Sequence, residues 1–204
     1  MSMVKKEEAL EEVKLDNIRN FSIIAHVDHG KSTLANCFLK KMVKSDRLSS
    51  LETTSKALCR FDLEEQKGVT FKLNCVRLLY HSPRHKNFFA FNLIDTPGHV
   101  DFKYEVVLSL AVCEGVILLV DATRGIQAQT LFYYNIAKNL QLKILPVISK
   151  VDLASSQIEL VQKQLVKLLN CLVEDILLIS SKTGYNIDVL FEKIVDFLPS
   201  PSLK

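Results

Sequence analysis

AHVDHGKS, residues 25–32, lies between an apolar run that ends at Ile24 and a helical pattern that begins near Thr33. This order of strand, glycine-containing loop and helix is typical of a phosphate-binding loop. In such a loop, backbone N–H groups and a helix N-terminus point at phosphate oxygens. Gly30 lets the main chain approach the anion, and Lys31 can reach the outer phosphates. The stretch therefore predicts a nucleotide-phosphate site at the end of a strand.

The residues expected at the phosphates share this loop and the helix start that follows it. The Ser32 hydroxyl stands where the motif places a Mg²⁺ ligand. Ala25 stands where the general motif has glycine. This difference points to a narrower group of phosphate-loop proteins and still allows a phosphate-binding loop. We expect phosphate contacts from Ala25, His26, Val27, Asp28, His29, Gly30, Lys31, Ser32 and Thr33.

Composition limits the kind of chain this can be. The 204 residues are 48% hydrophobic and 24% charged, enough for one sizeable core, and the net charge of +3 is too small to identify a nucleic-acid binder. Five widely spaced cysteines predict buried thiols in a reducing compartment. Apolar runs shorter than ~18 residues, and a start without the apolar centre of a signal peptide, predict an intracellular protein with no transmembrane segment.

The chain divides into a charged tail and one domain. Residues 1–17 are dominated by Lys and Glu, and we assign them no function. In residues 18–204, short apolar runs alternate with helical patterns, which predicts an α/β fold with ligand sites at the C-terminal ends of the strands. Strands are expected at 20–25, 71–80, 88–94, 115–120, 142–148 and 176–179, and helices near 32–43, 101–111, 127–139, 156–169 and 187–198.

Connections between these segments refine the prediction. The strands at 71–80 and 88–94 are separated by too few residues for a crossover, so they should pair antiparallel and make a mixed, mostly parallel six-stranded sheet with helices on both faces.

Residues 44–67 lack a clean period of apolar residues, which suggests a mobile loop near the phosphate site. Ser156 and Glu159 are spaced as a capping box, and the last helix carries one apolar stripe.

Three further motifs follow predicted strands. In DTPGH, residues 95–99, the Asp95 carboxylate can hold a Mg²⁺-bound water and the Gly98 N–H can meet a γ-phosphate. In SKVD, residues 149–152, the Asp152 carboxylate can accept from guanine N1–H and its 2-amino group. Sites of this kind discriminate by about 10⁴, which favours GTP over ATP. In SSK, residues 180–182, a backbone N–H can donate to guanine O6. Expected guanine contacts are Ser149, Lys150, Asp152, Ser180, Ser181 and Lys182.

Taken singly, the first of these motifs could be an ordinary Pro-Gly turn and the second a surface loop. Their order along the chain is more specific. With the phosphate loop, they resemble the GTP-binding domain of translational GTPases. The stretches IRNFSII (18–24), LIDTPGHVDFKY (93–104) and ATRGIQAQT (122–130) are similar to the LepA family, also called elongation factor 4. The resemblance covers residues 18–201, and QAQT at 127–130 is its most specific part.

This resemblance implies a P-loop GTPase G domain that hydrolyses GTP to GDP and phosphate with Mg²⁺. It implies that His99 is the catalytic residue, which orients or deprotonates the attacking water once the large-subunit rRNA of the ribosome moves it into place. Thr70, in GVT at 68–70, would complete the metal shell formed by Ser32 and by Asp95 through water.

Other residues have weaker implied roles. Asp28 resembles a P-loop aspartate that helps to hold the loop or a monovalent cation, and Val27 matches one side of a hydrophobic gate beside the catalytic histidine. His29 receives no role. Ser149 replaces the asparagine usual in the family. We expect this difference to affect the affinity for nucleotide more than the selectivity for guanine.

The resemblance leads to one main functional hypothesis. It is a ribosome-activated GTPase acting on elongating ribosomes, with a back-translocation or fidelity role. A GTP/GDP-binding switch module with little hydrolysis and another translational GTPase subfamily are the alternatives. We expect a monomer, further C-terminal domains in a longer polypeptide, and residence in the bacterial cytoplasm or in a mitochondrion or plastid, with peripheral membrane association implied by family analogy.

Overall fold

The computed structural model describes residues 13–45, 75–96 and 103–201. Most of the loop expected at 44–67 lies outside these ranges, and so do Thr70, Gly98 and His99. The described elements are η1 (Leu15–Asn17), β1 (Ile18–Ala25), α2 (Lys31–Ser45), β2 (Cys75–Ser82), β3 (Asn87–Ile94), α4 (Lys103–Ala111), β4 (Gly115–Asp121), α5 (Ala128–Asn139), β5 (Lys143–Ser149), α6 (Ile158–Leu169), η3 (Val173–Asp175), β6 (Leu177–Leu178) and α7 (Ile187–Phe197).

The strands form one six-stranded sheet in the order β2-β3-β1-β4-β5-β6. β1 is parallel to both neighbours, pairing Phe21 with Leu93 of β3 and with Gly115 of β4, and β5 and β6 continue in parallel. β2 runs antiparallel to β3. The predicted mixed α/β sheet is therefore confirmed, although the hairpin turn spans only 83–86 because the strands extend to Ser82 and from Asn87.

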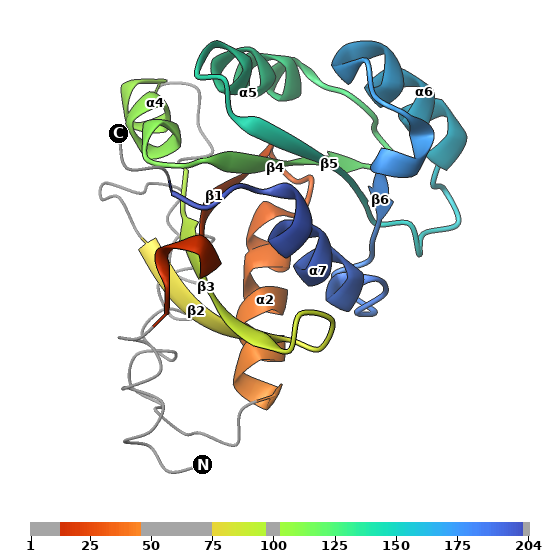
Figure 1. Ribbon diagram of the computed structural model, residues 1–204. Helices are drawn as coiled ribbons and strands as arrows, with labels where there is room; N and C mark the ends of the chain where they lie inside the picture. The colour runs from red at the N-terminus through yellow and green to blue at the C-terminus, as the bar shows by residue number, and fades with distance from the viewer. Residues whose placement is uncertain (1–12, 46–74, 97–102, 202–204) are drawn as a thin grey trace.

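Helices cover both faces of the sheet (Figure 1), as the alternation of strands and helices predicts. On β4, Ile117 and Leu119 belong to the core shared with α2 and α7. Val116, Leu118 and Val120 point the other way, into the core shared with α4, α5 and α6. All five side chains have no exposed area, which is why this strand reads as an uninterrupted apolar run.

The apolar stripe predicted for the last helix is confirmed. Its residues are at most 2% exposed, and each such buried side chain contributes about 1.5–3 kcal/mol by leaving water. These residues are Ile187, Leu190, Phe191, Ile194 and Leu198.

The capping box predicted for α6 is wrong. The helix begins at Ile158 after Gln157, and the Ser156 N–H instead donates to Leu153 O in the preceding turn. The Gln157 N–H donates to Ala122 O at 2.7 Å, and this tertiary bond holds the chain where the helix begins.

The four described cysteines are free thiols, but they are less uniformly buried than the sequence suggests. Cys113 is buried, and burial raises the pKa of its thiol. Cys75 is exposed at the start of β2. Within the described ranges, no helix is both long enough and apolar enough to cross a membrane.

Five parallel strands end at the same edge of the sheet, and this decides where a site can lie. β1 has β3 on one side and β4 on the other, so the chain leaves its carboxyl end at a topological switch point. The phosphate-loop sequence begins there, directly after Ala25. The segments after Ile94, Asp121 and Ser149 emerge at the same edge.

Candidate functional site

The loop at 26–30 joins β1 to α2 in a tight turn. Asp28 and Gly30 both have positive φ, 65° and 97°, and the His29 N–H donates to His26 O at 3.2 Å. A φ near 97° suits glycine best because it has no Cβ. The bond from the Leu34 N–H to Gly30 O opens α2, which leaves the N–H groups of 31–33 without a carbonyl in the helix. This turn can therefore bind an anion.

Side chains from neighbouring segments hold this loop by its main chain. They come from the first turn of α5, from the last residue of β5 and from the residue after it. Three consecutive loop residues are held in this way, so the loop is positioned from outside as well as by its own turn. The Val27 N–H donates to Gln129 Oε1 at 2.9 Å, Lys150 Nζ donates to Asp28 O at 2.6 Å, and Ser149 Oγ donates to His29 O at 2.9 Å.

The hydrogen bond from Ser149 to His29 shows what serine does where the family usually has asparagine. A hydroxyl at this position still reaches the phosphate loop, through His29 O, and it lies within 3.4 Å of Val120 O. Ser149 is 3% exposed, so the bond forms away from water. The hydrogen bond between the 149–152 motif and the phosphate loop therefore forms with serine at position 149.

His29 is a buried support of the same loop. Its side chain has no exposed area, and its Nδ1 accepts from the Asp121 N–H at 3.3 Å. The accepted bond requires an unprotonated Nδ1, which is the neutral tautomer with hydrogen on Nε2. Burial lowers the pKa of His29 to about 4, although the nearby Asp121 carboxylate acts in the opposite direction. His29 is therefore neutral at neutral pH and joins the loop to the end of β4.

Asp121 is a site residue that the sequence analysis missed. Its carboxylate is 1% exposed, pairs with Lys150 Nζ at 2.7 Å and accepts two bonds of 2.7 Å from Thr123. Burial alone would raise the pKa of Asp121, but hydrogen bonds from Lys150 and Thr123 outweigh it and lower that pKa. The available signal was its place directly after a buried strand. Lys150, expected at the guanine, therefore also bridges the phosphate loop and β4.

Asp95 lies opposite the phosphate loop. Its carboxylate is 8% exposed, and its Oδ1 lies 2.7 Å from Lys31 Nζ. Lys31 also donates to the Thr96 carbonyl and lies 3.1 Å from Thr96 Oγ1. Thr96 Oγ1 in turn donates to Ile23 O of β1 at 3.2 Å. The beginning of the second motif is thus joined to the first by ionic and hydrogen bonds.

The two predicted base-binding loops lie side by side. The Val151 N–H contacts Ile179 O at 3.4 Å, which links the loop after β5 to the loop after β6. Asp152 and Lys182 are exposed at this edge. Ser180 is buried, and its hydroxyl and carbonyl accept from the N–H groups of Thr183 and Gly184, so Ser181 lies within a closed turn.

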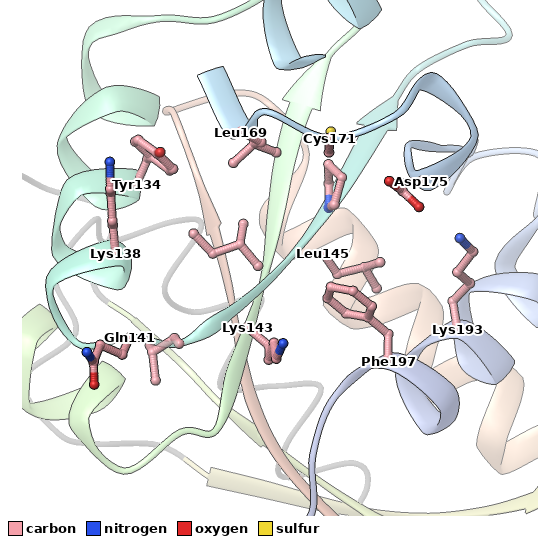
Figure 2. A pocket seen from close by; sticks show the side chains of 13 residues that line it. Tyr134, Lys138, Gln141, Lys143, Leu145, Leu169, Cys171, Asp175, Lys193 and Phe197 are labelled. Atoms are coloured by element: carbon pink, nitrogen blue, oxygen red, sulfur yellow. The ribbon is translucent and has the colours of Figure 1, made fainter. Parts of the chain in front are cut away.

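A separate cavity of about 460 Å³ lies at the amino end of β5, away from the phosphate loop (Figure 2). Its apolar floor includes Leu145, Leu169 and Phe197, and Lys138 and Lys193 lie at its rim. No residue of the predicted nucleotide site lines it.

The fold and the loops at the carboxyl edge define a class, the P-loop nucleotide-binding proteins built on a mixed α/β sheet. A family model described as the elongation factor Tu GTP binding domain matches residues 16–200, and the chain belongs to this family.

Similar proteins carry translation-factor names. The chain is 48% identical over 186 residues to the mitochondrial translation factor GUF1 homolog of Ixodes scapularis, covering 91% of this chain and 28% of that protein. It is 46% identical over 199 residues to elongation factor 4 of Staphylococcus carnosus, covering 98% and 32%. The chain thus spans about a third or less of the length of these two relatives.

Solved structures share the fold. A bacterial selenocysteine-specific elongation factor, EF-Sec, superposes with a TM-score of 0.64 at 25% identity, over 88% of this chain and 28% of that chain. The elongation factor SelB of Methanococcus maripaludis, solved with the GTP analogue GppNHp, gives a TM-score of 0.64 at 20% identity, over 93% and 36%.

Proposed function

We propose that this chain is the GTP-binding and GTP-hydrolysing domain of a LepA-type translation factor that acts on elongating ribosomes. The family match supports GTP as the nucleotide, and relatives named elongation factor 4 support the subfamily. The observation that carries the proposal is the 2.7 Å approach of Lys31 Nζ to Asp95 Oδ1. It brings the lysine of the phosphate loop and the carboxylate of the second motif to one point at the carboxyl edge of the sheet.

Phosphate binding is proposed for residues 25–33 together with Gly98. The turn with positive φ at Asp28 and Gly30 supports this role, and so do the N–H groups of 31–33, which precede the first hydrogen bond of α2. Lys31 would exchange its contact with Asp95 for contacts with the outer phosphates.

Guanine binding is proposed for the end of β5 and the loops after β5 and β6, at Ser149, Lys150, Asp152, Ser180, Ser181 and Lys182.

The oxygen donors near Lys31 fit Mg²⁺. Among the described residues, no three His, Cys, Asp or Glu side chains gather as a metal cluster, so the protein alone does not form a cage. The buried Asp95 carboxylate and the Ser32 hydroxyl are hard oxygen ligands of the kind Mg²⁺ shares with nucleotide phosphates. We propose that Ser32 and Thr70 hold the ion directly and Asp95 through water. Bound there, Mg²⁺ would offset negative charge on the phosphates.

A monovalent cation beside Asp28 is a finer part of the same proposal. Arg124 Nη1 lies 3.7 Å from Asp28 Oδ2, and both side chains are exposed, by 50% and 70%. A bound cation would share this carboxylate with the Arg124 guanidinium.

Hydrolysis is proposed to depend on His99, which would orient or deprotonate the attacking water. Phosphoryl transfer asks the protein mainly for positioning and charge stabilisation, so one imidazole in the right place suffices. We propose that ribosomal RNA brings His99 into that place, and the isolated domain is then expected to be slow.

The test measures GTP turnover by the full-length protein with and without ribosomes. We expect ribosomes to stimulate the wild type strongly and His99→Ala to lower the stimulated rate by about 100-fold or more. GDP affinity should stay unchanged. His81→Ala is the matched control, because His81 is exposed on β2, the edge strand far from the phosphate loop in the sheet.

Two results would count against the proposal. Absence of ribosome stimulation in the wild type would reject the ribosome-activated GTPase. Tight GDP binding without turnover would favour the alternative, a GTP/GDP switch module with little hydrolysis.

The remaining parts of the proposal concern the whole protein. We propose a monomer that reaches the ribosome through further C-terminal domains, with residues 1–17 as a charged tail. Relatives include a mitochondrial protein and bacterial proteins, which is consistent with a mitochondrion, plastid or bacterial cytoplasm. Peripheral membrane association rests on family analogy alone.

A further inference from the structure

The segment 122–130, which runs from the end of β4 into the first turn of α5, contacts two consecutive residues of the phosphate loop. Gln129 Oε1 accepts from the Val27 N–H at 2.9 Å. Arg124 Nη1 lies 3.7 Å from the carboxylate of the next residue, Asp28. The Arg124 pair is exposed and contributes little. The Gln129 bond is also exposed, but it is short and joins a half-buried side chain to the main chain, so it constrains where the loop can go.

The bond to Val27 determines the orientation of that residue. An amide N–H has one hydrogen, so its donation to Gln129 directs it toward α5. The Val27 side chain is 47% exposed. The carbonyls of Asp28 and His29 are held by other residues, Lys150 and Ser149, which leaves Gln129 as the described partner of Val27.

Gln129 is itself firmly placed. Thr130 has no exposed area, and its hydroxyl accepts from the Gln127 N–H at 3.3 Å at the start of α5. The Ile126 N–H donates to Gln164 Oε1 of α6 at 3.0 Å. A helix start anchored to its own first turn and to α6 gives Gln129 a rigid base.

We propose that Gln129 is a positioning residue that holds Val27 in place and so sets the rate of GTP hydrolysis more than the affinity for nucleotide. The inference rests on the proposed GTPase function. The physical reason is that the transition state tolerates less displacement of the loop than the bound nucleotide does. The proposed ground-state contacts through Lys31, Ser32 and the base-binding loops do not involve Gln129.

The test compares three variants of the full-length protein on ribosomes. Gln129→Met keeps the length of the side chain and removes the acceptor, whereas Gln129→Glu keeps an acceptor for the same N–H. Asn135→Leu is the matched control on the same helix, because it also replaces an amide by an apolar group and Asn135 is exposed further along α5, away from the helix start. The measurements are kcat and KM for GTP, and the Kd of fluorescent mant-GDP.

We expect Gln129→Met to lower kcat about fivefold, the effect of one neutral hydrogen bond, with the Kd within about twofold of wild type. Gln129→Glu should recover most of kcat, and Asn135→Leu should behave as wild type. A kcat for Gln129→Met no lower than that of Asn135→Leu, or a parallel loss of kcat and GDP affinity, would overturn the inference.

Hydrogen exchange at the Val27 amide provides a readout that does not depend on catalysis. With GDP bound, exchange should become several-fold faster in Gln129→Met and stay unchanged in Asn135→Leu. Unchanged exchange in Gln129→Met overturns the contact itself. If the wild type hydrolyses no GTP, the proposed function and the kinetic part of this inference fail together, and faster exchange would still support the holding of Val27 by Gln129.

Discussion

Replacing His29 by glutamine should remove a large part of the sensitivity of this fold to acid. His29 has no exposed area, and burial lowers its pKa from 6.5 to about 4. Its Nδ1 accepts from the Asp121 N–H, whereas the amide of glutamine does not titrate. The variant therefore removes the proton-binding group, and any loss of the bond to Asp121 changes the free energy of unfolding equally at every pH.

The sign of the effect follows from the lowered pKa. Between pH 6.5 and about 4, only the unfolded chain takes up a proton on this residue, so acid favours unfolding. The contribution is fully present above pH 6.5 and is lost as the pH falls towards the folded value. At about 1.4 kcal/mol for each pKa unit, the whole effect is about 3 kcal/mol, of which about 2 kcal/mol is lost between pH 7.5 and pH 5.

Urea denaturation at these two pH values measures the free energy of unfolding. Wild type should lose about 2 kcal/mol more than His29→Gln on acidification, whatever constant offset the substitution adds. His81→Gln, at an exposed histidine, should follow the wild type. If wild type and His29→Gln differ by the same amount at both pH values, within about 0.5 kcal/mol, a buried neutral His29 is refuted.

Three further substitutions test the site. Asp152→Ala should weaken GDP binding by about 100-fold in a nucleotide titration, because two bonds to a carboxylate are lost at about 1.5 kcal/mol each; unchanged affinity would contradict its role at the base. Ser149→Ala leaves His29 O without its buried donor and should cost about 1–2 kcal/mol in urea denaturation, whereas a neutral effect would show that the bond is dispensable. Lys150→Met leaves the Asp121 carboxylate without its ion pair. Because the Lys150 side chain is 33% exposed, we expect about 2 kcal/mol, less than for a fully buried pair, and an unchanged melting temperature would exclude this contribution.

The local patterns of the sequence were sufficient for the architecture. Periods of apolar residues predict the strands and the stripe of the last helix, because burial of one face follows from spacing alone. The short link before β3 predicts the antiparallel hairpin, and the structure has it. The start of α6 was not predictable in this way. It depends on a hydrogen bond from the Gln157 N–H to the carbonyl of Ala122, 35 positions earlier in the chain. Local capping preferences contain no information about such a distant contact.

The sequence by itself determined which chemical groups are available: a phosphate loop ending in Lys31 and Ser32, a carboxylate at Asp95 and an acidic residue at Asp152. Each belongs to a short motif, and a motif is readable because its residues act through neighbouring backbone. Only the tertiary structure decided how the loop is held. His29 lies 92 positions before its partner Asp121, and Val27 lies 102 positions before its partner Gln129; these pairs meet because parallel strands end at one edge of the sheet. Burial at that edge keeps His29 neutral, and no local pattern predicts it, since burial is a property of the packed molecule.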